Sequence, residues 1–184
     1  MWWSRVAQPK VRAWAGDPLK VQVLKSEDTD PDPDAIACYG FYRHDTRQVT
    51  VRFVEGRPVG ELTIQFLEWL CWGSAQEGKR VLVVIWDGPS WHTAESVIGW
   101  IGDQNRRAER GAGVRVEVCE LPVASPWLNN IEPCWTHAKK AVMEADRKLT
   151  AAEITQRVCE HFGCALLPYL KTVPPGGKRK DAPV

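Results

Sequence analysis

The fold is decided by the segment from Val81 to Asp87, which reads VLVVIWD and is followed by Gly88-Pro89. A continuous apolar run that stops at a turn signal predicts a short strand buried on both faces, as in the parallel sheets of α/β proteins. Ligands of such sheets bind at the carboxyl ends of the strands, so Asp87 has the position of a functional residue. Asp is also common at the start of an Asp-Gly-Pro turn, and position alone leaves both roles open.

Further elements are predicted on both sides of this strand. Upstream, the sequence predicts a short strand at 21–24 in a loop-rich segment, strands at 36–42 and 48–54 joined by a hairpin turn, and a helix at about 59–75. Downstream, it predicts a helix at 93–110, a strand at 114–121, a loop at 122–129, a helix from 129 or 130 to about 145, and a helix that opens with a capping box at Thr150–Glu153. The apolar stripes of the two middle helices are Ala94, Ile98, Ile101 and Ala108, and Ile131, Trp135, Ala138 and Val142. This order indicates an α/β fold with a mixed sheet and helices on both faces, and it is similar to the ribonuclease-H-like fold.

The composition fits one domain of ordinary size. The chain has 184 residues, with 24 Lys and Arg against 23 Asp and Glu, so any contact with DNA must use local basic patches. No apolar run reaches the roughly 18 residues of a membrane span, and the first residues lack the apolar stretch of a signal peptide. We therefore predict a cytoplasmic protein without membrane contact, with one domain over 1–165 and a flexible basic tail over 166–184.

The cysteines and tryptophans allow other functions. The six cysteines form no Cys-x-x-Cys pair, so buried or half-buried thiols are favoured over a metal site. The nearest approach to a ligand set is Cys159, His161 and Cys164, and a cysteine-ligated metal protein is the weakest of the candidate functions. An exposed Trp could stack on DNA bases, although packing in the core is favoured for any one of the ten.

A second motif lies downstream, where residues 121–135 read LPVASPWLNNIEPCW. It resembles the signature Leu-Pro-x-x-Ser-Pro-x-Leu-Asn-Pro-Ile-Glu-x-x-Trp of mariner-superfamily DDE transposases, in particular their bacterial insertion-sequence branch. Residues 86–92, WDGPSWH, are similar to the Asp-Asn-x-x-x-His element of that family. The resemblance implies that Asp87 is the second catalytic carboxylate and Glu132 the third. Glu132 lies in the first turn of a predicted helix, where the helix dipole also favours an acid.

The resemblance also implies a chemistry and partners. Transposases cut a phosphodiester bond and join the 3′ end to target DNA by in-line displacements, in which two Mg²⁺ or Mn²⁺ ions about 4 Å apart stabilise the attacking and leaving oxygens. The partners would be double-stranded DNA, as transposon ends and as target, and a second copy of the chain in a homodimer. When bound to DNA, the protein would be associated with the bacterial nucleoid.

Several further residues are candidates for supporting roles. His92 would stand beside the metal or contact DNA, and an ordinary solvated role is the alternative. The other candidates for positioning or for contact with DNA are Asn129, Arg106, Arg107, Lys139 and Lys140. A solvated helix face is the alternative for the lysine pair. Gly88 and Asn130 depart from the family pattern, which has Asn and Pro at these positions, and Asn130 could cap the helix instead.

No Asp in this sequence has the position expected for the first catalytic Asp of the family. It should lie on an apolar strand ahead of the hairpin, whereas Asp17 lies in Gly-Asp-Pro, 28–34 is an acidic loop and Asp45 lies in the hairpin turn. In relatives this acid comes just before a stretch resembling Trp2–Pro9. We therefore expect a reading frame that begins inside the ancestral gene, and cleavage near background, because removing one member of a cooperative catalytic set removes most of the activity. The alternative function is a non-catalytic DNA-binding or interaction remnant of a transposase.

Overall fold

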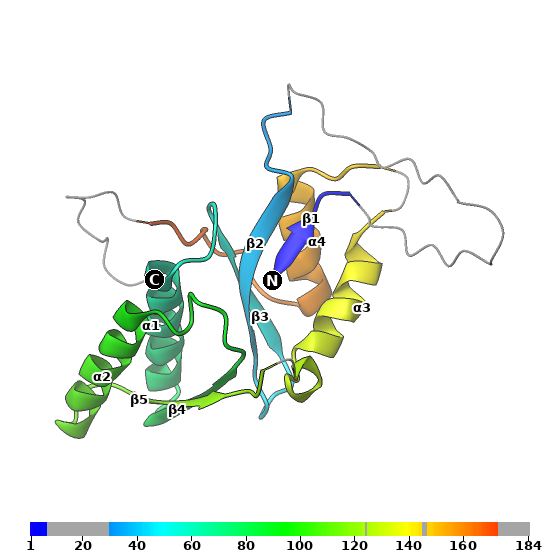
Figure 1. The fold of residues 1–184 in the computed structure, drawn as a ribbon. Helices are drawn as coiled ribbons and strands as arrows, with labels where there is room; N and C mark the ends of the chain where they lie inside the picture. The colour runs from blue at the N-terminus through cyan, green and yellow to red at the C-terminus, as the bar shows by residue number, and fades with distance from the viewer. Residues whose placement is uncertain (7–29, 124, 145–146, 173–184) are drawn as a thin grey trace. The chain divides into compact units, whose positions relative to one another are not determined.

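Two short sheets organise the chain (Figure 1). The computed structural model describes residues 1–6, 30–123, 125–144 and 147–172. The chain divides into a first unit, Met1–Phe53 with Pro133–Leu167, and a second unit, Val54–Glu132 with Pro168–Val184. The predicted strand at 21–24 and the predicted tail beyond residue 172 lie outside the described residues.

The first unit contains the three-stranded sheet, with strand order β1-β2-β3. These strands are β1 (Trp2–Ser4), β2 (Ala35–Tyr42) and β3 (Val49–Val54). β1 runs antiparallel to β2 with Trp3 opposite Ile36. The predicted hairpin turn is confirmed, since the Arg43 N–H donates to the Gln48 carbonyl at 2.8 Å where β2 passes to β3. β1 was not predicted, because three residues are too few to show a period and their partners lie more than 30 residues away.

Helices α3 (Glu132–Val142) and α4 (Ala151–Phe162) complete this unit. The Trp135 ring meets Trp3 edge to face at a centroid distance of 6.1 Å and Phe162 at 5.6 Å, so one indole joins the sheet to both helices. Such aromatic pairs contribute about 0.5–1.5 kcal/mol beyond the area that they bury. The predicted stripe of α3 is confirmed, because all of its members are buried. The predicted capping box of α4 is also confirmed: the Thr150 hydroxyl accepts from the Glu153 N–H, and the Glu153 carboxylate accepts from the Thr150 N–H.

A buried arginine ties together distant parts of the first unit. Arg5 is 4% exposed, and its guanidinium donates to the Leu149 carbonyl at 2.7 Å and lies 2.9 Å from the Asp30 carboxylate. The Asp32 carboxylate lies 3.6 Å from the same guanidinium and also accepts the N–H of Ala151, the first residue of α4. Lys148 adds a second cation at 2.6 Å from Asp30. The acidic segment therefore binds the β1 end and the start of α4 through charge-assisted hydrogen bonds.

The second unit is built on a parallel pair of strands. Its elements are α1 (Gly60–Gln76), β4 (Val81–Trp86), α2 (Glu95–Glu109) and β5 (Arg115–Glu120). β4 and β5 pair in register from Val81 opposite Arg115 to Trp86 opposite Glu120. The strands and helices predicted for this unit are confirmed, as is the α/β class with antiparallel and parallel strands. In the described residues, however, the strands form two separate sheets.

Only one face of β4 is buried, which corrects the prediction of burial on both faces. Leu82, Val84 and Trp86 are at most 8% exposed, whereas the alternate residues Val81, Val83 and Ile85 are 49%, 59% and 56% exposed. Figure 1 shows the reason, because α1 and α2 lie on the same side of the β4–β5 pair. An apolar run shows that both faces are hydrophobic but does not show on which side the following helices pack.

Polar side chains of α2 complete the outer edge of β5. The Asn105 side chain donates to the Val116 carbonyl at 2.9 Å and accepts from the Val116 N–H at 2.7 Å, so it satisfies both backbone groups on the side away from β4. The buried Gln104 side chain donates to the Val114 carbonyl at 2.8 Å. The predicted apolar stripe of α2 is wrong at Ile98, which is 60% exposed. The helix packs instead through Val97 and these amides, because the amides supply hydrogen bonds that an edge strand needs.

The segment after α4 returns to the second unit. Leu170, which falls within the predicted tail, is buried and forms a parallel β-bridge with Val54. Over the residues that the structure describes, no helix combines the length and the apolar character that crossing a membrane requires.

Candidate functional site

The structure places Asp87 directly after the last residue of β4. The backbone there is held by the parallel pairing and by the Leu121 N–H, which donates to the Trp86 carbonyl at 2.9 Å. The Asp87 side chain is 64% exposed, so its carboxylate is accessible to a ligand from solution. Asp87 therefore combines a fixed backbone with an open side chain at the carboxyl end of a strand, as the strand pattern predicts.

His92 folds back onto Asp87. A turn closed by the His92 N–H and the Pro89 carbonyl at 2.9 Å reverses the chain, and the His92 Nδ1 atom then lies 3.2 Å from the Asp87 backbone oxygen and 3.5 Å from its Oδ1. The imidazole is stacked on Trp86 at a centroid distance of 4.9 Å and an interplanar angle of 15°. Trp91 meets the same ring edge on at 6.0 Å. These aromatic contacts hold the imidazole where its Nδ1 faces the Asp87 carboxylate.

The contact with His92 changes the acidity of Asp87. The hydrogen bond from the His92 side chain lowers the pKa of the Asp87 carboxyl below its ordinary value, and the opposing effect of partial burial is smaller. The carboxyl group is therefore ionised at neutral pH, which is the state that a cation or a hydrogen-bond donor binds.

Glu132 lies in the first turn of α3, as predicted, although the helix begins at Glu132 itself and not at Asn129 or Asn130. Its N–H donates to the Asn129 carbonyl at 3.0 Å, and the Asn129 side-chain oxygen accepts from the Ile131 N–H at 3.5 Å. Ile131 and Trp135 are buried on either side of Glu132 in sequence, whereas Glu132 itself is half-buried. Asn129 thus helps to set the start of the helix, and an acid at this start is also favoured by the helix dipole.

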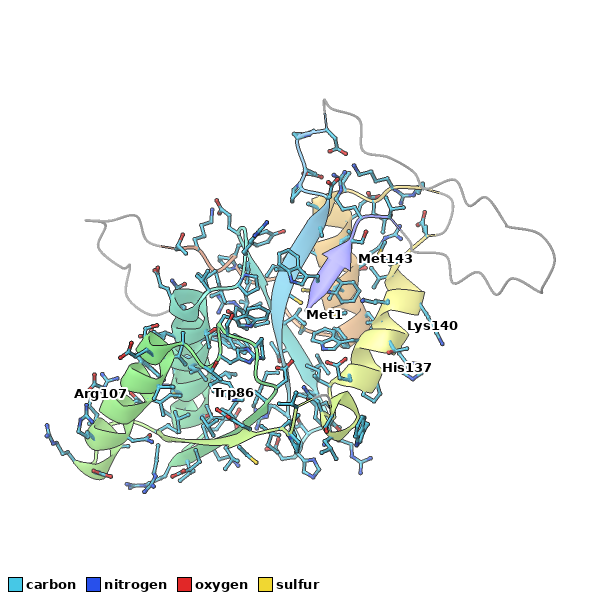
Figure 2. All side chains as sticks on the ribbon, viewed as in Figure 1. Met1, Trp86, Arg107, His137, Lys140 and Met143 are labelled. Carbon is cyan, nitrogen blue, oxygen red and sulfur yellow. The ribbon has the colours of Figure 1, made fainter. Side chains whose placement is uncertain are left out.

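The predicted basic residues lie on two helices that belong to different units. Arg106 and Arg107 are exposed near the end of α2, where Arg106 pairs with Asp103 and Arg107 donates to Gln104. Lys139 and Lys140 are exposed in the last turn of α3, and Figure 2 shows Lys140 extending away from the helix. Asp103 partly neutralises Arg106, whereas Gln104 is an uncharged amide and leaves the positive charge of Arg107 in place.

The donor set fits a hard divalent cation in type but not in number. Mg²⁺ and Mn²⁺ prefer oxygen ligands, and Asp87 and Glu132 supply carboxylates. In the described part of the chain, no three His, Cys, Asp or Glu residues form a group that could hold a metal ion. The same finding applies to Cys159, His161 and Cys164, so the cysteine-ligated metal site considered from the sequence is not formed there.

An exposed apolar loop leads into Glu132. Val123, Trp127 and Leu128 are 97%, 75% and 49% exposed. Hydrogen-bonded turns nevertheless order the backbone, with the Ser125 N–H donating to Pro122 at 3.2 Å and the Leu128 N–H donating to Ser125 at 3.1 Å. An ordered loop that exposes large apolar side chains is typical of an interaction site. Trp127 was not among the residues predicted to be functional, although it stands beside Leu128 between Pro126 and Pro133.

Comparison with known proteins identifies the family of the chain. Residues 5–154 match the family model described as DDE superfamily endonuclease. The matched region contains both Asp87 and Glu132. Domains of this family bind nucleic acid and usually use divalent metal ions. No curated protein matches the chain.

Proposed function

Because the chain belongs to the DDE superfamily endonucleases, we propose that it is a transposase catalytic domain in which Asp87 and Glu132 bind divalent metal ions. The observation that carries this proposal is the ionised, accessible carboxylate of Asp87 at the carboxyl end of β4, inside the matched region. The motifs at 86–92 and 121–135 support the mariner superfamily and its bacterial insertion-sequence branch as the closer relationship.

Each residue has a role that follows from its surroundings. Asp87 supplies an oxygen ligand that does not need to lose a proton at neutral pH. His92 is a positioning residue, because it contacts Asp87 and is itself oriented by Trp86. Glu132 supplies the second carboxylate from a helix start fixed by Asn129. When bound, Mg²⁺ or Mn²⁺ stabilises charge on the attacking and leaving oxygens of the phosphodiester.

The DNA would be held by basic side chains outside this pair of acids. Lys139 and Lys140 are our first candidates for phosphate contacts, followed by Arg106 and Arg107. The substrate would be double-stranded DNA, both as the transposon end and as the target. Because transposition joins two ends, the functional form would be a homodimer.

A second candidate is a non-catalytic DNA-binding remnant. One observation favours it: in the described residues, the strands of the three-stranded sheet contain no Asp or Glu that could serve as a third acidic ligand. Two carboxylates alone would hold Mg²⁺ weakly, since Mg²⁺ demands near-ideal octahedral geometry. DNA binding would then persist without cleavage.

Metal binding separates the two candidates. Mn²⁺ binding is measured by electron paramagnetic resonance for the wild-type chain, Asp87→Asn, Glu132→Gln and the control Glu109→Gln, an exposed acid on α2. The catalytic-domain proposal expects saturable binding that both site variants lose and the control retains. Nicking of supercoiled plasmid DNA in the same buffer then reports competence. Binding of DNA without saturable Mn²⁺ binding would support the remnant instead.

A further inference from the structure

The C-terminal end of α4 brings together two cysteines that the proposed function does not use. Gly163 has a left-handed backbone, with φ of 63°, and its N–H donates to the Glu160 carbonyl at 3.2 Å. The next N–H, of Cys164, donates to the Cys159 carbonyl at 3.0 Å. This pair of bonds is a Schellman motif, in which the side chains of the first and last residues contact each other. Here those residues are Cys159 and Cys164.

We propose that Cys159 and Cys164 form a reversible intrachain disulfide that closes the end of α4. The backbone bond between them holds their Cα atoms near the range of roughly 4.4–6.8 Å that disulfides span. The Cys159 Sγ donates to the Ala165 carbonyl at 3.8 Å, so this thiol faces the turn that carries Cys164, the residue just before Ala165. Gly163 permits this geometry because a left-handed residue between the two cysteines is what turns Cys164 back over the helix.

The two thiols differ in exposure, and this difference sets the order of reaction. Cys159 is buried, and burial raises the pKa of its thiol to about 12. Cys164 is half-exposed. Because the thiolate is the nucleophile, the accessible Cys164 reacts first with an oxidant such as glutathione disulfide.

The exchange balances in two steps. The Cys164 thiolate attacks one sulfur of glutathione disulfide, which forms a mixed disulfide and releases one glutathione thiolate that takes up a proton. Cys159 then loses its proton, attacks the Cys164 sulfur and releases the second glutathione. The two cysteines lose two electrons, and one glutathione disulfide is reduced to two glutathione molecules.

The disulfide would lie beside the packing centre of the first unit. Phe162, which stands between the cysteines in sequence, meets Trp135 of α3 edge to face at 5.6 Å. Cross-linking the end of α4 would hold this contact, because it limits fraying of the last helical turn. We expect the midpoint of thermal unfolding to rise by a few degrees on oxidation and to return on reduction.

Peptide mapping tests the proposal without any substitution. Tryptic cleavage after Arg157 and Lys171 gives one peptide, Val158–Lys171, that contains both cysteines and no other. After treatment of the whole chain with glutathione disulfide and acid quenching, this peptide should lose the mass of two hydrogens and regain it with dithiothreitol. A stable glutathionyl group on Cys164, an unmodified peptide, or a cross-link to Cys38 would each overturn the proposal.

Two variants test the order of the steps. In Cys159→Ser, Cys164 should retain the mass of one glutathionyl group, because the resolving thiol is missing. In Cys164→Ser, Cys159 should remain unmodified. The matched control is Cys119→Ser, which removes an exposed thiol of β5 and should leave the linked peptide and the thermal shift unchanged. Glutathionylation of Cys159 in Cys164→Ser would contradict the order of attack.

Discussion

Each of the two units is stabilised internally by a different kind of contact. In the first unit, Arg5 joins segments that lie up to 144 residues apart through buried, charge-assisted bonds. In the second unit, α1, β4, α2 and β5 follow one another directly, and Asn105 satisfies an edge strand only 11 residues away. The first unit therefore depends on long-range polar contacts, whereas the second depends on local packing and exposes the other face of β4. This comparison predicts where substitutions do the most damage.

The largest effect should follow loss of the buried guanidinium. Arg5→Ala leaves Asp30 and Asp32 without their main cation and the Leu149 carbonyl without its donor, and breaking such a buried pair costs about 3 kcal/mol of unfolding free energy. Chemical denaturation measures the loss. Hydrogen exchange should rise in β2 and α4 peptides more than in α1 peptides. The control is Arg43→Ala, which removes a more exposed ion pair with Asp45 and should cost about 0.5 kcal/mol. Equal costs for the two arginines would refute the dependence of the first unit on Arg5.

A smaller loss is expected from the amide that completes β5. Asn105→Ala leaves the N–H and the carbonyl of Val116 without their side-chain partners, and such groups cost about 2 kcal/mol when buried. Hydrogen exchange should increase locally at Val116 and its neighbours. Gln156→Ala is the matched control, because its amide bonds Glu160 on an exposed face of α4. If protection from hydrogen exchange were lost evenly over both units, the second unit would not depend on local contacts as proposed.

The same contrast explains what could be predicted from the sequence. Local sequence patterns were sufficient to predict β4, β5, the apolar stripe of α3 and the capping box of Thr150, because each depends on residues that are close together in the sequence. β1 and the bonds of Arg5 depend on partners far along the chain, which no local period reveals. The exposure of the Val83 side chain depends on the face of the sheet against which α2 packs. The apolar run of β4 does not indicate that face.

In the candidate site, too, local sequence features could be predicted and features that depend on the fold could not. Asp87 and Glu132 could be proposed because a strand end and a sequence motif mark them, and the place of Glu132 in the first turn of α3 is confirmed. Their role as metal ligands remains a prediction. The stacking of His92 on Trp86 requires the turn at Pro89. The geometry of this turn cannot be predicted from the spacing of the residues alone. Trp127 was not singled out because apolar side chains are expected to be buried, and exposure is a property of the fold.

Exposure in the second unit leads to a prediction about binding rather than stability. Trp127→Ala should weaken binding of a fluorescein-labelled DNA with a single-stranded overhang by about 1 kcal/mol, roughly fivefold in affinity, if the indole stacks on an unpaired base. Fluorescence anisotropy measures the affinity. Trp72→Ala, which removes another exposed Trp of the same unit, should leave it unchanged. Equal effects of both substitutions would mean that Trp127 has no special contact with DNA.

The ionic network of the first unit should also give it a distinct response to acid. Arg5 and then Lys148 hold the pKa of Asp30 far below its ordinary value. A carboxyl group whose pKa is lowered by folding contributes stability above its unfolded pKa of about 3.9, and this contribution is lost as the pH falls toward the folded value. Asp30→Asn should therefore flatten the fall in unfolding free energy between about pH 5 and pH 2. An unchanged slope in denaturation measured across this range would contradict the assignment.

The smallest effect is expected at the accessible carboxylate of the second unit. His92→Ala removes the hydrogen bond that contributes most to the low pKa of Asp87, so this pKa should rise toward its ordinary value. Carboxyl-selective ¹³C NMR titration of the wild type and of the variant measures the shift, and His44→Ala, which removes an exposed imidazole in the hairpin turn, is the control. Because Asp87 is largely open to water, overall stability should change little even though the local ionisation does. If Asp87 titrates alike in both proteins, His92 does not position it, and the two aromatic contacts of the imidazole are then packing alone.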